Sequence, residues 1–393
     1  MSANPIAINA QTPSEEREDI IILDLNKGNF IQRLAFSNSK RNGSLRLFWL
    51  LYILHYIIYF KDIYSTDQLF KHYFNVNAQL TSNDIIICSI PPTGFLIKTY
   101  KLIKKNTIPL IVDYRDPWTY GYRILNVNHI FYLFRVLLER RAEKNILSYA
   151  LNVFTVSESL KRFFPRKIRG KISVLKNGAN VSAINKERIT DQFDVFRIIY
   201  SGTLYRSQLK DESFFFNLIC FIETNHIKPG QLELCFLGAG QELLLKKIIN
   251  KYRLNDFTTI SDRLPLEESM EVMCSASVFL HLKYGSRSKI ITSKQADYLA
   301  LQKPILLPLT DHGDIAQSIV ENNAGYVCNS KEECLAALNE LWRKFQNKES
   351  FVIERPADFH YKLSREYEAQ KLVAIVKELM DERSSEASPA HKK

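Results

Sequence analysis

Short apolar segments alternate with amphipathic ones along most of this chain, and this alternation constrains its fold more than any other feature. From residue 84 onward the apolar segments, such as residues 85–90 and 232–237, are followed by glycine, proline or polar residues. Short apolar runs bounded in this way are typical of buried strands, and amphipathic stretches are typical of helices. Strands that alternate with helices favour a parallel sheet with helices on both faces. We therefore predict an α/β fold built from doubly wound, Rossmann-like sheets.

The alternation pauses in a polar segment at residues 181–194 and then starts again. A chain of 393 residues is too long for one ordinary hydrophobic core, so two domains are expected. The predicted parts are an N-terminal domain at residues 1–185, in which 1–19 is disordered and 20–25 is the first strand, a C-terminal domain at 195–360, a long helix at 361–380 and a tail at 381–393.

The charge balance points to an anionic partner. The chain carries 53 Lys and Arg against 42 Asp and Glu, a net charge of +11. Nucleic acid, an anionic membrane surface and a phosphate-bearing substrate would all suit this charge. The basic residues are scattered, and the sequence contains no zinc-finger or RNA-binding signature. We therefore favour a phosphate-bearing substrate or a membrane surface over nucleic acid.

The cysteines and the N-terminal residues indicate the cellular compartment in which the protein is expected. None of the six cysteines forms a CxxC pair, and Cys88 and Cys235 lie within apolar runs, so free thiols are expected, with no metal site. The polar N-terminus does not resemble a secretory signal peptide. We expect a cytoplasmic protein.

An aromatic, apolar run at residues 47–60 interrupts the polar N-terminal region. Its fourteen residues, between Arg46 and Lys61, are fewer than the roughly 20 that a membrane-spanning helix needs. Two interpretations stay open: a helix buried against the domain, or a helix lying in the interface of an anionic membrane. The second would make the protein peripheral at the inner face of the cytoplasmic membrane.

Charged residues follow the apolar run at 108–112, in the segment IPLIVDYRDPW. Asp113, Arg115 and Asp116 are expected at the carboxyl end of this strand, where parallel sheets bind ligands. The alternative is an Asp–Arg pair that closes a turn, with Trp118 packed in the core.

Glycines end two strands of the second half, in SGTL at 201–204 and LGAG at 237–240. A glycine there lets backbone N–H groups approach a phosphate, although such glycines also serve as plain turns. Ser293 and Lys294 stand at an expected helix start, which suits a diphosphate. Asp297, one turn on, is expected on the same side, either to bind sugar or ribose hydroxyls or to pair with Lys294. The loop at 262–265, which contains Arg263, is either the edge of a base pocket or a plain loop.

Six segments together resemble one enzyme family. They are IVDYRDPW, FTVSESL, VLKNGAN, IIYSGTLY, LCFLGAG and SKQADYLALQKPIL, and they occur in the family's order between about residues 83 and 380. The resemblance is to GT-B glycosyltransferases of the family 4 type, and most of all to the bacterial branch that makes surface polysaccharides. The segment Pro91-Pro92-Thr93-Gly94 fits that branch as well.

The resemblance implies two Rossmann-like domains that face each other across a cleft, with a last helix crossing back to the first domain. It implies a hexosyltransferase-like enzyme that moves a sugar from a nucleoside-diphosphate sugar to a glycan or lipid-linked acceptor. Retention of configuration is implied, and neither a metal nor another cofactor is expected. With the strand-end residues above, the predicted donor-binding residues are Gly202, Thr203, Arg206, Gly238, Ala239, Arg263, Ser293, Lys294 and Asp297. The predicted catalytic residues are Asp113, Arg115, Asp116 and Lys294, and the predicted acceptor-side residues are Pro92, Thr93, Gly94, Asp116 and Trp118.

The sequence departs from the family at two places. Lys289 stands where the first acidic residue of the family's Glu-x7-Glu motif is expected, and no glycine-rich loop follows residues 20–25. These departures motivate a second hypothesis, a catalytically silent homologue that acts as a scaffold or partner of an active glycosyltransferase. A plain Rossmann enzyme for dinucleotides or phosphosugars is disfavoured, because no GxGxxG follows an early strand.

Overall fold

The chain forms two compact units, Met1–Val174 and Leu175–Lys393, which we call unit 1 and unit 2. The structure, a computed structural model, describes residues 6–7, 16–17, 20–22, 50, 84–90, 93–105, 107–120, 130–184, 189, 194–239, 242–285, 288–289 and 291–387. The apolar run at 47–60, apart from Leu50, and Pro92 lie outside these residues. Each unit is described by itself.

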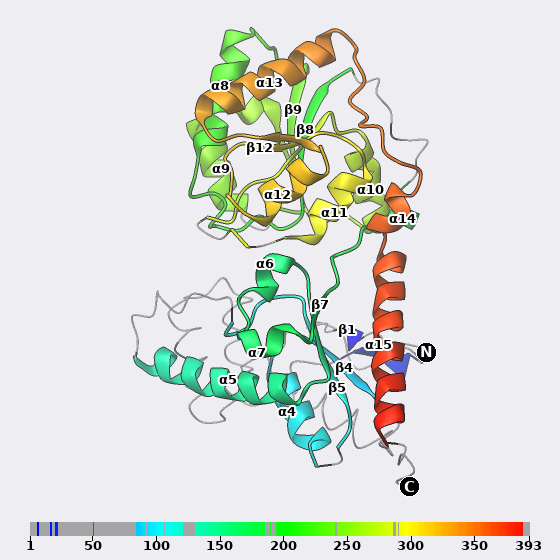
Figure 1. Ribbon diagram of the computed structural model, residues 1–393. Coiled ribbons are helices and arrows are strands. Elements are labelled where there is room, and N and C mark those ends of the chain that lie inside the picture. Colours follow the sequence, from blue (N-terminus) through cyan, green and yellow to red (C-terminus); the bar gives the residue numbers. More distant parts are fainter. Residues whose placement is uncertain are drawn as a thin grey trace. The chain divides into compact units, whose positions relative to one another are not determined.

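Unit 1 contains a four-stranded parallel sheet in the order β4-β5-β6-β7, and Figure 1 labels three of its strands, β4, β5 and β7. Its strands are β4 (Ile86–Ile90), β5 (Leu110–Tyr114), β6 (Asn152–Thr155) and β7 (Ile172–Val174). Its helices are α4 (Thr93–Ile103), α5 (Ile130–Tyr149), α6 (Glu158–Lys161) and α7 (Arg166–Arg169). Ser157 caps α6, because its side chain accepts a hydrogen bond from the Leu160 N–H. All five residues of β5 are buried, as expected for a parallel strand covered on both faces.

The strand predicted at residues 20–25 belongs to a different sheet. Strand β3 (Ile20–Ile22) pairs with β1 (Ile6–Ala7) in parallel and with β2 (Glu16–Arg17) in antiparallel orientation. This small sheet is separate from the sheet of β4–β7. The described part of unit 1 therefore starts its parallel sheet at β4.

Unit 2 contains a six-stranded parallel sheet in the order β10-β9-β8-β11-β12-β13. Its strands are β8 (Phe196–Ser201), β9 (Leu232–Leu237), β10 (Thr258–Ser261), β11 (Val278–Leu280), β12 (Ile305–Leu307) and β13 (Gly325–Val327). The first strand in the chain, β8, lies in the middle of the sheet. β9 and β10 are added on one side of it, and β11, β12 and β13 on the other, so the strand order reverses between β8 and β11 while all strands stay parallel. This is the strand order of dinucleotide-binding folds, in which ligands bind at the carboxyl ends of the strands where the order reverses.

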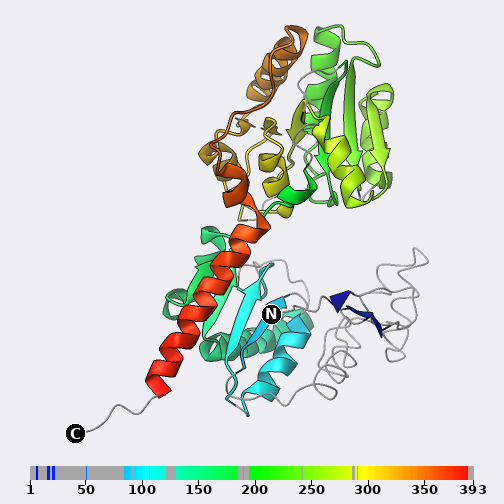
Figure 2. The same ribbon diagram turned by 90° about the vertical axis from the view of Figure 1, so that its right-hand side faces the viewer.

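Helices cover both faces of this sheet (Figures 1 and 2). They are α8 (Ser213–Thr224), α9 (Glu242–Lys251), α10 (Leu266–Cys274), α11 (Ser293–Ala300), α12 (Asp314–Glu321) and α13 (Lys331–Gln346), with 3-10 turns at Val181–Ala183 and Asn255–Phe257. Ile198 packs in the core cluster that includes α8 and α13, whereas its neighbour Ile199 packs in the cluster that includes α11 and α12. This alternation follows from the pleat of the strand.

The helix predicted at 361–380 is broken. Ser364 separates α14 (Phe359–Leu363) from α15 (Arg365–Ala387), and its backbone is extended. Its side chain accepts a hydrogen bond from the Tyr367 N–H, which starts the second helix. Ser364 also pairs with Ala179 in a short parallel bridge, and the described residues 181–184 of the predicted linker fall within the range of unit 2.

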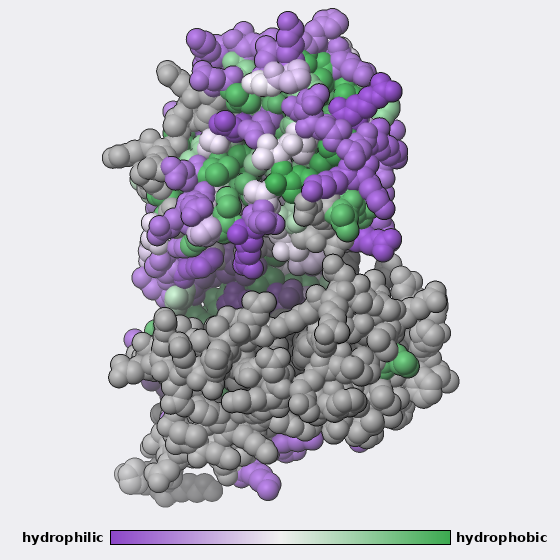
Figure 3. Space-filling model, turned by 180° about the vertical axis from the view of Figure 1, so that it is seen from behind, coloured by the Kyte–Doolittle hydropathy of each residue, from purple (hydrophilic) through white to green (hydrophobic). Residues whose placement is uncertain are grey.

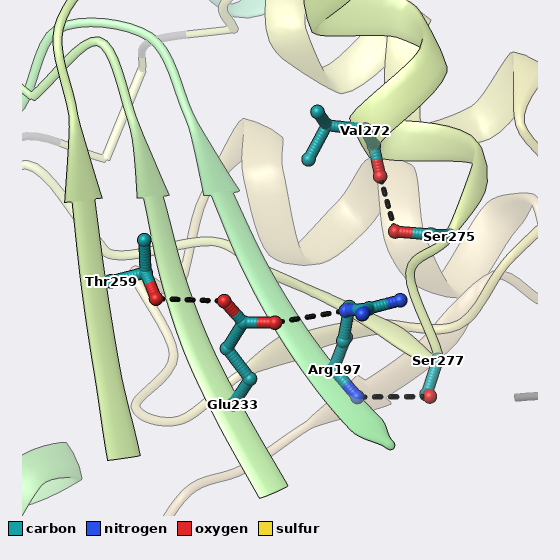
Figure 4. Close-up of polar contacts among 6 residues, drawn as sticks. All are labelled: Arg197, Glu233, Thr259, Val272, Ser275 and Ser277. Atoms are coloured by element: carbon teal, nitrogen blue, oxygen red, sulfur yellow. Dashed lines mark hydrogen bonds and ion pairs between the residues drawn. The ribbon is translucent and has the colours of Figure 1, made fainter. Parts of the chain in front are cut away.

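Polar side chains at the amino ends of β8, β9 and β10 form hydrogen bonds with one another (Figure 4). Glu233 on β9 accepts hydrogen bonds from Arg197 on β8 at 2.9 Å and from Thr259 on β10 at 2.7 Å. Ser277 accepts one from the Arg197 N–H at 3.1 Å. The opposite, carboxyl edge carries the glycine-containing turns.

Hydrophilic side chains cover most of the face of unit 2 shown in Figure 3, with smaller hydrophobic areas among them. Among the described residues, no helix has the length and apolar character that crossing a membrane requires. The six cysteines, all within the described residues, form no disulfide bond with one another, and five of them are buried.

Candidate functional site

Three neighbouring strands of unit 2 end at the same level. The last residues of β8, β9 and β10 lie in register, and Gly202 and Gly238 directly follow β8 and β9. The Gly202 N–H donates to the Leu237 carbonyl at 2.7 Å, and the Gly238 N–H donates to the Ser261 carbonyl at 3.1 Å. These bonds hold both glycine turns at the carboxyl edge of the sheet, where its strand order reverses.

Gly202 and Lys294 lie side by side at this edge, as the sequence predicted. Gly202 has a φ of +86°, a backbone conformation that glycine adopts without steric cost. A Cβ atom at this position would lie 3.8 Å from both Cε and Nζ of Lys294. Lys294 reaches this point from the first turn of α11.

Lys294 is a buried amine. Its Nζ donates a hydrogen bond to the Tyr200 hydroxyl at 2.6 Å and lies 3.8 Å from the centre of the Tyr200 ring. Lys294 is only 9% exposed, and burial lowers its pKa from 10.5 to about 7. An anion that reached Nζ would restore the positive charge that burial disfavours. This arrangement therefore suits a phosphate group better than a neutral ligand.

A second glycine turn lies beside a basic residue. Gly238 has a φ of +69°, and a Cβ there would lie 3.6 Å from the Arg263 Cα. Arg263 is exposed, and Ala239 is half-buried. The structure thus brings the LGAG turn and the loop after β10 together.

The other predicted donor residues of the β8 and α11 ends lie at the surface. Thr203 and Arg206 are exposed in the loop after β8, and Ser293 is exposed as the first residue of α11. Their positions leave them accessible to a ligand that contacts Gly202.

Asp297 interacts with a different part of unit 2. Burial raises the pKa of its carboxyl group, while the Asn180 backbone N–H and the Arg365 guanidinium act in the opposite direction. Arg365 itself donates to the Gly178 carbonyl at 3.2 Å. Among the described residues, the Asp297 Oδ1 has no hydrogen-bond partner. Asp297 on α11 thus interacts electrostatically with Arg365 at the start of α15, and its Oδ1 accepts no hydrogen bond from the described residues.

In unit 1 the strand continues further than predicted. β5 extends to Tyr114, so Asp113 is a residue of the strand and not of the following loop. Asp113 is 5% exposed, and its Oδ2 accepts hydrogen bonds from Ser89 and from Arg115, each at 2.8 Å. These two hydrogen bonds to Oδ2 offset part of the cost of burying the carboxylate in the strand. Its Oδ1 has no partner among the described residues.

The remaining residues of this segment divide between surface and core. Asp116 is exposed after the strand. Trp118 is 7% exposed in the core of unit 1 and donates to Glu139 at 3.2 Å. The ion pair of Asp113 with Arg115 and the buried Trp118 are what the alternative interpretation of this segment predicted. Thr93, the first residue of α4, is half-buried, and Gly94 follows it in the helix.

Sequence reasoning missed three residues around Lys294. Tyr200 and His281 are fully buried, and Gln208 is 2% exposed. Burial and the neighbouring Lys294 charge lower the pKa of His281 to about 3, so its imidazole is neutral at physiological pH. Two of these residues could have been noticed in the sequence. Tyr200 is a tyrosine near the end of an aliphatic run, and His281 directly follows the apolar residues 278–280.

No protein-family model matches this sequence, and no curated protein matches it. Solved structures do match. One is a sucrose-phosphate synthase from Thermosynechococcus elongatus, with 12% identity, a TM-score of 0.59, and coverage of 94% of this chain and 86% of that chain. Another is an α,α-trehalose 6-phosphate synthase from Burkholderia multivorans, with 10% identity, a TM-score of 0.58, and coverage of 98% and 89%. A glycosyltransferase from Rickettsia africae matches with 13% identity, a TM-score of 0.53, and coverage of 92% and 86%.

These similarities establish the fold. The chain is an α/β protein of the GT-B type with two Rossmann-like units, as the sequence predicted. Fold alone does not determine an activity, so function has to be argued from the site.

Proposed function

We propose that this protein is a glycosyltransferase that binds a nucleoside-diphosphate sugar in unit 2 and transfers the sugar to a glycan or lipid-linked acceptor. The observation that carries the proposal is the buried amine of Lys294 beside the open turn at Gly202. In this reaction negative charge develops on the departing diphosphate. Lys294, Arg206 and the N-terminal end of α11 would stabilise that charge, so the reaction would need no metal.

The acceptor would bind to unit 1. Asp116 is exposed there, and the Asp113 carboxylate orients the Arg115 guanidinium. Asp116 would interact with the attacking hydroxyl, and Arg115 with negative charge on the acceptor. Retention of configuration and a role in bacterial surface polysaccharide biosynthesis are supported by the resemblance of the sequence segments described above.

A lipid-linked acceptor would place the protein at the cytoplasmic face of a membrane. The net charge of +11 supports contact with an anionic surface. The protein would then be a cytoplasmic enzyme that binds the membrane peripherally.

The test begins with binding. The full-length protein is screened against nucleotide-sugars by thermal shift, and UDP and GDP are titrated by calorimetry. A ligand that prefers the folded state raises the melting temperature, so at least one nucleotide-sugar should stabilise the protein and be turned over. Asp116→Asn should then slow transfer while leaving nucleotide affinity unchanged.

The second candidate is a silent GT-B homologue that acts as a scaffold, favoured by Lys289 at the first position of the acidic motif. Failure of both nucleotides to bind would overturn the glycosyltransferase proposal and leave the scaffold. Binding without turnover of any nucleotide-sugar, in the presence of membrane lipid extracts as acceptor, would also favour the scaffold.

A further inference from the structure

A buried chain of hydrogen bonds connects Lys294 to the loop after β8. The Lys294 Nζ donates to the Tyr200 hydroxyl at 2.6 Å. The Tyr200 hydroxyl in turn lies 3.1 Å from the Thr203 carbonyl and 3.2 Å from the Gln208 Oε1, to which it donates. We propose that Tyr200 and Gln208 are positioning residues that hold Lys294 and the loop at residues 201–206 ready for a diphosphate. This inference rests on the proposed function, because it explains how the donor site is held.

Both the oxygen and the nitrogen of the Gln208 side-chain amide form hydrogen bonds with backbone groups. Its Oε1 accepts the Tyr205 N–H at 3.0 Å, and its Nε2 donates to the Leu282 carbonyl at 2.8 Å. Leu282 follows β11, whereas Tyr205 follows β8. The amide therefore fastens the loop after β8 to the chain after β11, and these are the two strands between which the sheet reverses its order.

The Tyr200 hydroxyl has one hydrogen, and the loop and Gln208 use it. Its oxygen therefore presents a lone pair to Lys294. This acceptor favours the ammonium form of the lysine over the neutral amine. Tyr200 thus connects two properties of the site, the position of the loop and the protonation of Lys294.

Among the described residues, no ion pair neutralises Lys294, and its hydrogen-bond partner, the Tyr200 hydroxyl, is uncharged. His281 at the end of β11 is neutral, and burial raises the pKa values of Tyr200, Tyr284 and Tyr298 well above their usual range. The lowered pKa of Lys294 has burial as its cause. A bound diphosphate would be the missing counter-ion, and its binding near neutral pH would be accompanied by uptake of a proton.

The test measures this proton. UDP, or GDP if it binds more tightly, is titrated calorimetrically into the full-length protein at pH 7 in buffers of different ionisation enthalpy. Because burial lowers the pKa of Lys294 to about 7, the wild type should take up a fraction of a proton at Lys294 on binding. In Tyr200→Phe the ammonium loses its acceptor, so the pKa of Lys294 falls further. The uptake should then be larger than in the wild type, and affinity should fall about tenfold.

Two further variants distinguish a positioning role of Tyr200 and Gln208 from a general loss of packing around Lys294. Tyr298→Phe removes another buried hydroxyl, which accepts the Ser201 N–H at 2.8 Å and makes no hydrogen bond to Lys294. It should leave the proton uptake at the wild-type value. Gln208→Leu releases the loop but keeps the contact between Tyr200 and Lys294, so affinity should fall while proton uptake stays unchanged.

The outcomes distinguish this inference from the proposed function. If the wild type binds neither nucleotide, both fail. If it binds but Tyr200→Phe keeps the wild-type affinity and proton uptake, the positioning role is overturned and the glycosyltransferase proposal stands. Equal changes in Tyr298→Phe and Tyr200→Phe would also overturn the positioning role.

Discussion

Glu143 in unit 1 and Lys294 in unit 2 are both buried ionisable residues, but their surroundings differ. The Glu143 carboxylate accepts hydrogen bonds from the Tyr114 hydroxyl at 2.9 Å, from the Thr119 N–H at 3.0 Å and from the Thr119 hydroxyl. Among the described residues, Lys294 has one hydrogen-bond partner, the Tyr200 hydroxyl, and an open glycine turn beside it.

The difference separates a structural charge from a functional one. The partners of Glu143 lie within unit 1 and leave no side of the carboxylate to a ligand. Lys294 is buried and forms no ion pair with any other described residue, an arrangement that a folded protein tolerates when a ligand supplies the counter-ion. Three predictions can break or sharpen this contrast.

The largest effect is expected for Lys294→Met. Loss of the amine should weaken UDP binding about a hundredfold, because a charged hydrogen bond to the diphosphate disappears. The same change should stabilise the folded protein. The lowered pKa means that between about pH 7 and 10.5 the unfolded chain binds a proton that the folded chain lacks, so folding at neutral pH carries a cost. The variant should gain about 1–3 kcal/mol in free energy of unfolding at pH 7.

Calorimetry and urea unfolding measure these two changes. Lys251→Met is the matched control, because Lys251 is an exposed lysine of the same unit that pairs with Glu212. It should change neither binding nor stability by a comparable amount. Loss of stability in Lys294→Met would show that Lys294 has a structural role.

A smaller effect is expected from the titration of Glu143. Burial raises its pKa from 4.5 to about 7, despite hydrogen bonds that lower it. The folded state therefore keeps a proton that the unfolded state releases between about pH 4.5 and 7. The stability of unit 1 should fall across this range by about 1–3 kcal/mol and then level off.

Glu143→Gln should remove this slope without affecting UDP binding. Urea unfolding followed by Trp118 fluorescence reports on unit 1 when the other two tryptophans, Trp49 and Trp342, are replaced by phenylalanine. The difference between this background and its Glu143→Gln derivative isolates the contribution of Glu143. A slope that persists in the derivative would assign the pH dependence to other groups.

The smallest effect is expected for Gly202→Ala. Its positive φ disfavours alanine by about 1 kcal/mol, and the added Cβ would contact Lys294. UDP affinity should fall about fivefold as the turn shifts. Gly230→Ala is the control, because Gly230 has a φ of +89° and open space around a Cβ. Both variants should lose similar stability, and only Gly202→Ala should lose affinity.

Local patterns were sufficient for most of the fold. The apolar run at residues 232–237 forms β9 as predicted, and Gly202 and Gly238 directly follow β8 and β9, because short apolar runs that end in glycine are typical of buried strands. The end of β5 was misplaced, since the charge of Asp113 suggested a loop. The Ser89 hydroxyl, 24 residues away in the chain, helps to make that charge compatible with a strand. A single helix was predicted across Ser364, because the bridge to Ala179 that accompanies the break is a long-range contact.

The sequence by itself determined the glycines that follow two strands, at 202 and 238, and the lysine at the start of a helix, at 294. Only the tertiary structure decided what surrounds them. Lys294 meets Tyr200 from 94 positions away, and Asp297 interacts with Asn180 and Arg365. The physical reason is that the pKa and the binding capacity of a side chain depend on burial and on its partners, and folding brings those partners together from distant parts of the chain.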